Sequence, residues 1–243
     1  MKILNLNIGN PSVERARKQL NWILNKENYD IIILTEVKRS LGCALIESEL
    51  RSVGYTVYTD IEIKEYGVLF ATKHKCNIME MRDIDINLSN RMIVANIRIK
   101  NEIINIIGIY VPSNDKRKNE RKKIFLESVI SFLSQFNSSD KIILCGDFNT
   151  VMRNHMPKYS MFRSWEYLFF DEIDKLGLID SYESLYKNKQ VYSWFGKNGN
   201  AYKYDYIFIS NNLNKNLKDA IYLRDTIENK LSDHSASMIK LDI

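Results

Sequence analysis

Short apolar segments alternate with longer amphipathic segments along most of the chain. The apolar segments include IIIL at 31–34 and IILC at 142–145, and such runs are typical of buried strands. The amphipathic segments place apolar residues three or four positions apart, which is the spacing of one helix face. Helices are predicted over residues 12–26, 44–54, 120–136 and 164–177. Ser12 is a candidate N-cap of the first helix, and Gly54 ends the second.

The remaining apolar segments are short and many alternate with a period of two, as strands do. Strands are predicted over residues 2–8, 30–36, 55–60, 66–72, 76–84, 91–99, 102–112, 142–145, 204–210 and 235–243, and the strand at 142–145 is expected to stop at Gly146. Gly/Ser-rich linkers and repeats of fixed period are absent from the sequence, so we expect one domain over residues 1–243. Many strands and few helices favour an α/β protein in which two sheets pack face to face with helices outside.

Composition limits the range of partners only loosely. A net charge of +5 permits a polyanionic partner without requiring one. The densest basic run, DKRKNERKK at 115–123, is either a solvated helix face or a phosphate-contacting patch. No apolar run approaches the ~18 residues of a membrane span, and the N-terminal segment turns polar at once. With Cys43, Cys76 and Cys145 read as reduced thiols, we expect an intracellular, cytoplasmic protein with no membrane partner.

Polar residues stand at the ends of several predicted strands or close to them. They are Asn7, Glu36, Tyr110, Asp147, Asn149, Asp205, Asp233 and His234. Any one of them alone is more often a satisfied structural group. Together their carboxylates, amides, phenol and imidazole suit phosphodiester hydrolysis with a hard divalent ion, because Mg²⁺ prefers oxygen ligands and polarises phosphate. A further carboxylate can activate water, and a histidine can donate to the phosphate.

Six short motifs resemble, in order, those of the endonuclease/exonuclease/phosphatase superfamily. They are LNLN, LTE, IYVPS, GDFN, YDYIFIS and SDHS, and they span Asn7 to His234. Within the superfamily they are most similar to the exonuclease III and abasic-site endonuclease branch. The resemblance implies a metal-dependent phosphodiester hydrolase. It also implies a deoxyribonuclease I-like, four-layer α-β-β-α sandwich with two largely antiparallel sheets and helices on both outer faces.

The resemblance also implies a metal site and a hydrolytic carboxylate. Glu36 would be the principal ligand of Mg²⁺, or of Mn²⁺ as an alternative, assisted by Asn7 and Asp233. Asp147 would activate the attacking water or protonate the leaving group. Asn149 would hold both Asp147 and the phosphate.

The remaining motifs imply phosphate contacts. His234, supported by Asp205, would bind the scissile phosphate, and Tyr110 would contact it from the other side. Other branches generally carry a histidine at the place of Tyr110, so the phenol favours the DNA-cleaving branch. A phenol with a pKa near ~10 is a poor acid but a good hydrogen-bond donor. The alternative is that Tyr110 is merely an aromatic residue at a strand end.

Four further residues are candidate substrate contacts. Trp194 and Phe195, in the segment SWF, would wall a pocket for a base-less sugar or stack on a terminal base. Core packing is the alternative for both. Lys203 would contact a phosphate as a point charge, where many relatives have arginine. Ser113 replaces an Asn or Gln and would make a weaker phosphate contact.

Other departures bear on specificity. Gly9 stands where relatives often have Asp or Asn near the metal, and Thr35 replaces a Gln. The segment between Trp194 and Asp205, which in relatives carries a DNA-inserting loop, is short. These differences leave the catalytic set complete but weaken the prediction of abasic specificity.

The sequence therefore predicts a monomeric Mg²⁺-dependent phosphodiesterase that acts on duplex DNA with a lesion or a 3′ end. The predicted type is an abasic-site endonuclease or 3′-to-5′ exonuclease with a role in DNA repair. Three alternatives stay open. In the first, the protein would be a phosphoesterase for RNA, nucleotides or lipid headgroups. In the second it would be a nuclease recruited to defence or transposition, and in the third a non-catalytic nucleic-acid-binding descendant.

Overall fold

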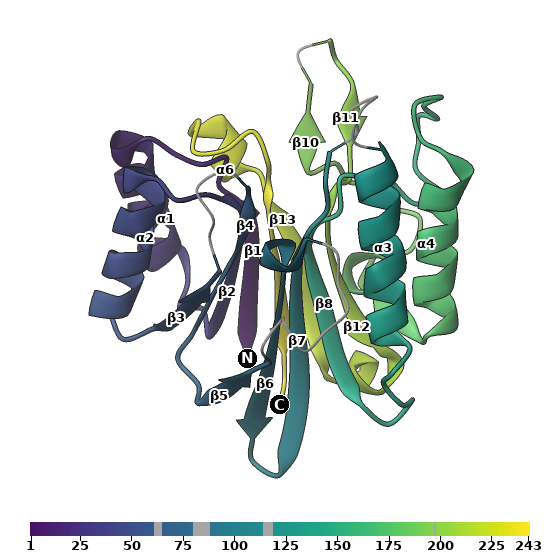
Figure 1. Cartoon of the computed structure of the whole chain (residues 1–243), viewed down its shortest axis with the longest axis horizontal. Helices are drawn as coiled ribbons and strands as arrows, with labels where there is room; N and C mark the ends of the chain where they lie inside the picture. The colour runs from purple at the N-terminus through teal and green to yellow at the C-terminus, as the bar shows by residue number, and fades with distance from the viewer. Residues whose placement is uncertain (61–64, 80–87, 114–118, 197) are drawn as a thin grey trace.

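The two predicted sheets are present and pack face to face. The computed structural model describes residues 1–243 except 61–64, 80–87, 114–118 and 197. Helices α1 (Val13–Lys26) and α2 (Leu41–Ser52) cover the outer face of one sheet. Helices α3 (Asn119–Leu133) and α4 (Ser164–Lys175) cover the outer face of the other, as Figure 1 shows. This arrangement confirms the four-layer sandwich.

Each sheet has six strands and is largely antiparallel. The first sheet contains, in spatial order, β13 (Leu217–Leu223), β14 (Ala236–Leu241), β1 (Lys2–Asn7), β2 (Ile31–Val37), β4 (Gly67–Thr72) and β3 (Thr56–Thr59). The second contains β5 (Cys76–Ile78), β6 (Met92–Ile99), β7 (Glu102–Tyr110), β8 (Lys141–Asp147), β12 (Asp205–Ser210) and β9 (Leu178–Asp180). Only the described pairs β1–β2 and β7–β8 are parallel. These two pairs lie at the centres of the sheets and carry the GDFN and LNLN motifs.

Shorter elements complete the described chain. They are η2 (Ser89–Arg91), α5 (Ser181–Leu185), β10 (Trp194–Phe195), β11 (Ala201–Tyr202), η3 (Asn211–Asn216) and α6 (Asp225–Glu228). Strands β10 and β11 pair with each other and project above the sheets in Figure 1.

Strand β8 shows how an apolar strand contributes to two cores at once, one on each of its faces. Ile143 and Cys145 point into the core between the two sheets. Ile142 and Leu144 point the other way, into the core beneath α3 and α4. Successive residues of a strand face opposite sides, so a strand covered on both faces must be apolar throughout. A third core fills the space between the first sheet and helices α1 and α2.

Several predicted boundaries and elements differ from the structure. Strand β8 does not stop at Gly146 but continues to Asp147. Helix α2 begins at Leu41, three residues earlier than predicted, because the Ser40 side chain caps it. Strands β9, β10, β11 and β13 have no counterpart in the prediction, since they are short or half-polar. The strand predicted over 76–84 ends as β5 at Ile78, and its residues 80–84 lie outside the described part of the chain.

Two predictions about the chain as a whole can be compared with the structure. Cys43, Cys76 and Cys145 are all free, as predicted. Among the described residues, no helix combines the length and the apolar character that a membrane crossing needs.

Candidate active site

Strand register brings three of the predicted site residues together at the ends of neighbouring strands in the second sheet. Tyr110 on β7 is the parallel neighbour of Asp147 on β8. Asp205 on β12 is the antiparallel neighbour of Asp147 on the other side. Gly146 makes this close pairing feasible. Its φ is +150°, and a β-carbon there would lie 1.8 Å from the Ile109 carbonyl oxygen. The glycine of GDFN is therefore required by the backbone beside it.

The first sheet contributes Asn7 across the interface between the sheets. The Asn7 Nδ2 donates to Asp147 Oδ2 at 2.9 Å, and the Asn7 Oδ1 accepts from the Gly9 N–H at 2.9 Å. Two residues earlier, Asn5 Nδ2 donates to the Gly146 carbonyl at 3.3 Å. These buried amides tie the two sheets together at the point where β1 and β8 end.

Glu36 reaches the same place through an irregularity in β2. The pairing of β2 with β4 shifts between Leu34 and Val37, and Glu36 has a φ of +58°. Such bulges redirect a side chain, and a left-handed non-glycine residue is held only by its surroundings. Glu36 is half-buried, and burial raises the pKa of its carboxyl, while His234 and the Asn7 hydrogen bond lower it. The geometry therefore holds a partly desolvated carboxylate beside Asn7.

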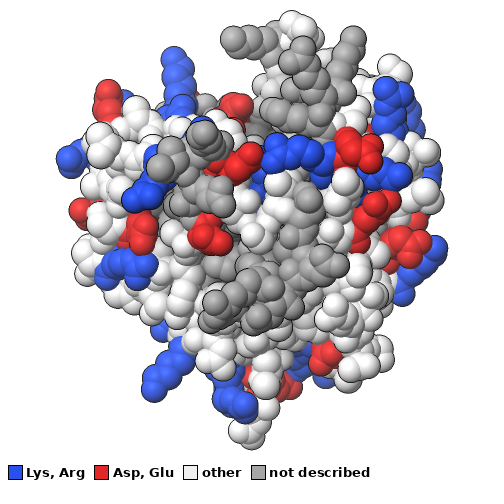
Figure 2. Space-filling model, viewed as in Figure 1, with Lys and Arg blue, Asp and Glu red and all other residues white. Residues whose placement is uncertain are grey.

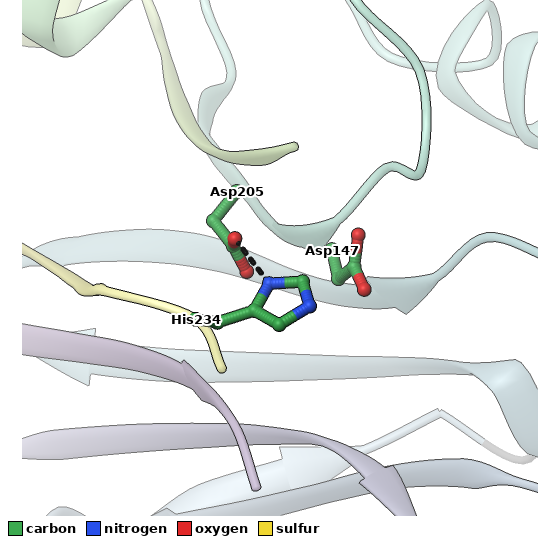
Figure 3. A group of neighbouring side chains, drawn as sticks. All are labelled: Asp147, Asp205 and His234. Atoms are coloured by element: carbon green, nitrogen blue, oxygen red, sulfur yellow. Dashed lines mark hydrogen bonds and ion pairs between the residues drawn. The ribbon is translucent and has the colours of Figure 1, made fainter. Parts of the chain in front are cut away.

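His234 and Asp205 form a buried pair, shown in Figure 3. The His234 Nδ1 lies 2.7 Å from Asp205 Oδ2, and the ring lies between the Asp205 and Asp147 carboxylates. Burial alone would lower the pKa of His234, but the adjacent Asp205 carboxylate raises it to about 10. The ring is therefore an imidazolium at neutral pH, with Nδ1–H directed to Asp205.

Asp147 is buried and accepts hydrogen bonds on both oxygens. Its Oδ1 accepts from the Asn149 N–H at 2.9 Å, and its Oδ2 accepts from Asn149 Nδ2 at 3.2 Å as well as from Asn7. Asn149 has a φ of +48°, a conformation that Asn tolerates better than most residues. Burial raises the pKa of the Asp147 carboxyl to about 7, although His234 opposes the shift. This carboxyl can therefore take up or release a proton near neutral pH.

The raised pKa of Asp147 predicts a pH dependence of stability. The folded pKa of about 7 lies above the ~3.9 of an unfolded aspartate, so the folded chain binds the extra proton between those values. The resulting stabilisation is complete below about pH 4 and is lost as pH rises through about 7. Relative to an Asp147→Asn variant, the free energy of unfolding of the metal-free wild type should fall across this window. Urea titrations of both proteins from pH 4 to pH 9 test this, and a rise would contradict it.

Tyr110 lies on the other side of Asp147 and is 5% exposed. Burial, with Glu36 and Asp147 adding to it, raises the pKa of the phenol far above its ordinary value. The hydroxyl therefore remains protonated and can only act as a donor or acceptor of hydrogen bonds. Arg91, which the sequence did not single out, covers the ring with its guanidinium 4.6 Å from the centroid, and its Nη1 donates to the Tyr110 carbonyl at 3.4 Å.

The chain as a whole has counterparts among known proteins. The profile of the Endonuclease/Exonuclease/phosphatase family matches residues 4–234. The chain belongs to this family. Membership makes it a phosphoester hydrolase, and the buried Asp147, Asp205 and His234 agree with that chemistry.

Two relatives match this family member along nearly their whole lengths. An exodeoxyribonuclease of Bacillus subtilis (strain 168) is 24% identical over 255 residues, covering 96% of each chain. Exodeoxyribonuclease III of Haemophilus influenzae is 25% identical over 271 residues, covering 97% of each chain.

Two solved structures of similar fold cover 100% of both chains. One is a 3′ phosphatase, NExo, from Neisseria bound to a product DNA hairpin, with a TM-score of 0.85 and 21% identity. The other is an AP endonuclease from Archaeoglobus fulgidus, with a TM-score of 0.83 and 19% identity. At these identities the likeness establishes the fold alone, the α/β sandwich of the family.

The aromatic residues predicted to contact substrate lie on the projecting hairpin of this family member. Trp194 and Phe195 form β10 and are half-buried, and Trp194 packs against a small buried cluster that includes Tyr202 and Tyr204. Trp194 stacks on Tyr202, with centroids 5.5 Å apart, and its Nε1 donates to Asp233 Oδ2 at 3.0 Å. Phe195 lies under the Arg224 guanidinium at 5.0 Å. Trp194 thus lies beside the exposed Asp233, and both rings are partly exposed.

Two other predicted contacts are placed differently. Lys203 is 4% exposed and forms an ion pair with the buried Asp180, above the ring of Tyr206 at 4.8 Å. Lys203 was expected to contact a phosphate, but in the structure its charge is neutralised by the buried Asp180. Ser113 is exposed and follows β7 by three residues, immediately before the undescribed residues 114–118.

The basic run at 115–123 is divided by the fold. Residues 115–118 lie outside the described part of the chain. Lys122 is fully buried, so at this position the run is not a solvated face. Figure 2 shows Lys and Arg interspersed with Asp and Glu on the visible face of the described residues, in keeping with the modest net charge of +5.

One group of described side chains has the spacing of a metal site. Candidate ligand atoms of Asp147, Asp205 and His234 all lie within 4.8 Å of one another. The three could hold a metal ion if the imidazole lost its proton.

Proposed function

We propose that the protein is a Mg²⁺-dependent phosphodiesterase acting on DNA, of the abasic-site endonuclease or 3′-to-5′ exonuclease type. The observation that carries the proposal is the placement of the protonated Tyr110 phenol and the His234 imidazolium on either side of Asp147. Two donors flanking one titratable carboxylate are suited to holding a phosphodiester while a water attacks it.

Oxygen ligands for a hard divalent cation lie on the Glu36 side of the site. Glu36, Asn7 and Asp233 would hold the ion, and the raised pKa of Glu36 fits, because a bound cation would offset the cost of keeping a half-buried carboxylate charged. When bound, Mg²⁺ polarises the phosphate and offsets negative charge on the leaving oxygen. Mn²⁺ satisfies the same ligand set.

The remaining chemistry belongs to side chains of the chain itself. Asp147 takes the proton of the attacking water as the new phosphorus–oxygen bond forms, and the leaving oxygen takes a proton from solvent as its bond to phosphorus breaks. Its hydrogen bonds from Asn7 and Asn149 hold the carboxylate in one orientation. His234 donates from Nε2 to a non-bridging phosphate oxygen, and Tyr110 donates from the opposite side. Asp205 keeps the imidazole protonated and fixes its plane.

Two features support DNA as the substrate. Tyr110 occupies the position where members that cut RNA tails, phospholipids or inositol phosphates, and the deoxyribonuclease I group, generally carry a histidine, so the phenol resembles the abasic endonuclease and exonuclease III branch. The relatives include exodeoxyribonucleases, and a protein of the same fold binds a product DNA hairpin. Trp194, next to Asp233, and Phe195, beneath Arg224, are both partly exposed on the hairpin and would contact the sugar or stack on a base there. We further propose that the enzyme acts inside the cell as a monomer in the repair of abasic sites or blocked 3′ ends.

Cleavage of labelled oligonucleotides tests this proposal. The protein is incubated with Mg²⁺ and an abasic duplex, an intact duplex labelled for 3′ digestion, or single-stranded RNA. We expect cleavage of one or both DNA substrates, slower attack on RNA, and loss of all activity with EDTA, because the phosphate then lacks its cation. Preferred cleavage of RNA, or full activity in EDTA, would contradict the proposal.

A further inference from the structure

Beneath the turn that carries Asp147 and Asn149 lies a buried pair of opposite charges. Lys122 on α3 and Glu166 on α4 have side chains 0% and 1% exposed, and they form an ion pair. The Lys122 ammonium also donates to the Asn149 carbonyl oxygen at 2.8 Å. The Glu166 Oε2 accepts from the Arg163 N–H at 2.7 Å, which fixes the carboxylate at the start of α4. A charged side chain of the helical layer thus reaches the backbone of the active-site turn.

Stability alone does not account for such a pair. Removing two charges from water costs several kcal/mol per ion, and well-packed apolar residues of similar volume are often equal or better for stability. The surrounding side chains on α3 and α4, such as Phe125, Val129 and Phe169, are apolar and buried. An apolar residue would therefore suit position 122 if packing were its only task. The contact with Asn149 is a feature that an apolar residue cannot supply.

The contact from Lys122 reaches the active site through the backbone of Asn149. Its φ of +48° is uncommon for a residue with a side chain, so neighbours must maintain it. In this conformation its N–H and Nδ2 both point to Asp147, and Nδ2 also donates to the Val111 carbonyl at 2.9 Å. Lys122 holds the carbonyl of the same residue. The carbonyl, the N–H and the side chain of Asn149 are therefore all anchored.

We propose that Lys122 is a positioning residue for hydrolysis, acting through the Asn149 backbone to orient the Asp147 carboxylate, while Glu166 balances the charge of Lys122. This inference rests on the proposed function, in which Asp147 is the base. Lys122 does not touch the substrate. Loss of its contact should let the turn relax, and a displacement of about 1 Å at a catalytic group can cost about a hundredfold in rate.

Three variants separate positioning from charge balance. Lys122→Met removes the donor to Asn149 and leaves Glu166 unpaired. Lys122→Met/Glu166→Gln removes the donor but also removes the unpaired charge. Glu166→Gln keeps the Lys122 nitrogen as a donor to Asn149. On the DNA substrate that the wild type cleaves, both Lys122 variants should lose about ten- to a hundredfold in kcat, with KM nearly unchanged. Glu166→Gln should remain within about threefold of the wild-type kcat.

A matched control distinguishes this effect from general loosening of α3. Val129 lies two turns further along α3 and faces the same core. Val129→Ala should lower Tm and leave kcat unchanged. The inference would be overturned if the Lys122 variants kept the wild-type kcat. It would also be overturned if Glu166→Gln and Val129→Ala lost as much kcat as the two Lys122 variants.

A second measurement does not depend on activity. The Asn149 amide proton is hydrogen-bonded to a carboxylate, and its chemical shift reports that bond. In the Lys122→Met/Glu166→Gln variant this resonance should move upfield and exchange faster with solvent, while it stays in place in Val129→Ala. An unchanged resonance would sink the positioning role even if the wild type cleaved none of the substrates. Absence of wild-type cleavage with a shifted resonance would overturn the proposed function and not the positioning.

Discussion

Replacing Asp147 with asparagine is expected to lower kcat on the preferred DNA substrate at least a hundredfold. Asparagine has the size of aspartate but cannot take a proton from water, and removing a general base typically costs 10²–10⁴-fold. KM should change little, because Asp147 is surrounded by Asn7 and Asn149 and is 1% exposed. Steady-state kinetics in saturating Mg²⁺ provide the measurement.

The fold should survive this substitution. The wild-type carboxyl already has a raised pKa because burial disfavours its charge, so a neutral side chain relieves that cost at pH 8. A Tm equal to or above that of the metal-free wild type at pH 8 would show that lost activity is chemical. Asp171→Asn is the matched control, since Asp171 is half-exposed on α4 and pairs with Arg153. Its kcat should equal that of the wild type, and a near-wild-type kcat for Asp147→Asn would refute the role of Asp147.

Replacing His234 with alanine should have a comparable effect on turnover and a further effect on stability. In the proposed mechanism the His234 imidazolium donates to the phosphate, and loss of one transition-state donor typically costs 10²–10³-fold in kcat. The substitution also leaves the fully buried Asp205 carboxylate without its partner. Breaking a buried pair in this way costs about 3–5 kcal/mol, so Tm should fall clearly.

The double variant Asp205→Asn/His234→Ala separates these two effects. Removing both charges should recover much of the lost Tm, because no unpaired carboxylate remains buried. Turnover should stay at the level of the single variant, since the donor to phosphate is still missing. His74→Ala, which changes a half-exposed histidine beside Asp30, serves as the matched control and should keep the wild-type kcat. Recovery of kcat in the double variant would contradict the role of His234.

The candidate site was largely predictable because its residues lie at strand ends in recognisable motifs. Glu36, Asp147, Asp205 and His234 each follow or begin an apolar segment, and a polar residue in such a place is visible without a structure. Arg91 had a weaker signal of the same kind, as the first residue of the apolar segment 91–99. A search for charged residues at both ends of each predicted strand would have found it.

Two charged residues are buried although the sequence suggested exposure, and the cause is the same for both. Lys122 stands in a dense basic run that looks solvated, yet the fold buries it against Glu166, some forty residues further along the chain. Lys203 stands beside a catalytic motif, yet it pairs with Asp180 on β9, a strand too short to be predicted. In both cases the partner is distant in sequence, so no local pattern reveals it. Burial of a charge depends on that partner rather than on neighbouring residues.

The sequence by itself determined the alternation of strands and helices, the two-sheet class, the family and the set of polar groups available for chemistry. These follow from local periodicity and short motifs, which record burial and backbone requirements residue by residue. Only the tertiary structure decided which of those groups meet. The register of β8 against β7 and β12 placed Tyr110 and Asp205 beside Asp147, and the facing sheet supplied Asn7. Such contacts depend on how strands distant in sequence align and on how the two sheets face each other. The free energy that favours one alignment is shared among many residues.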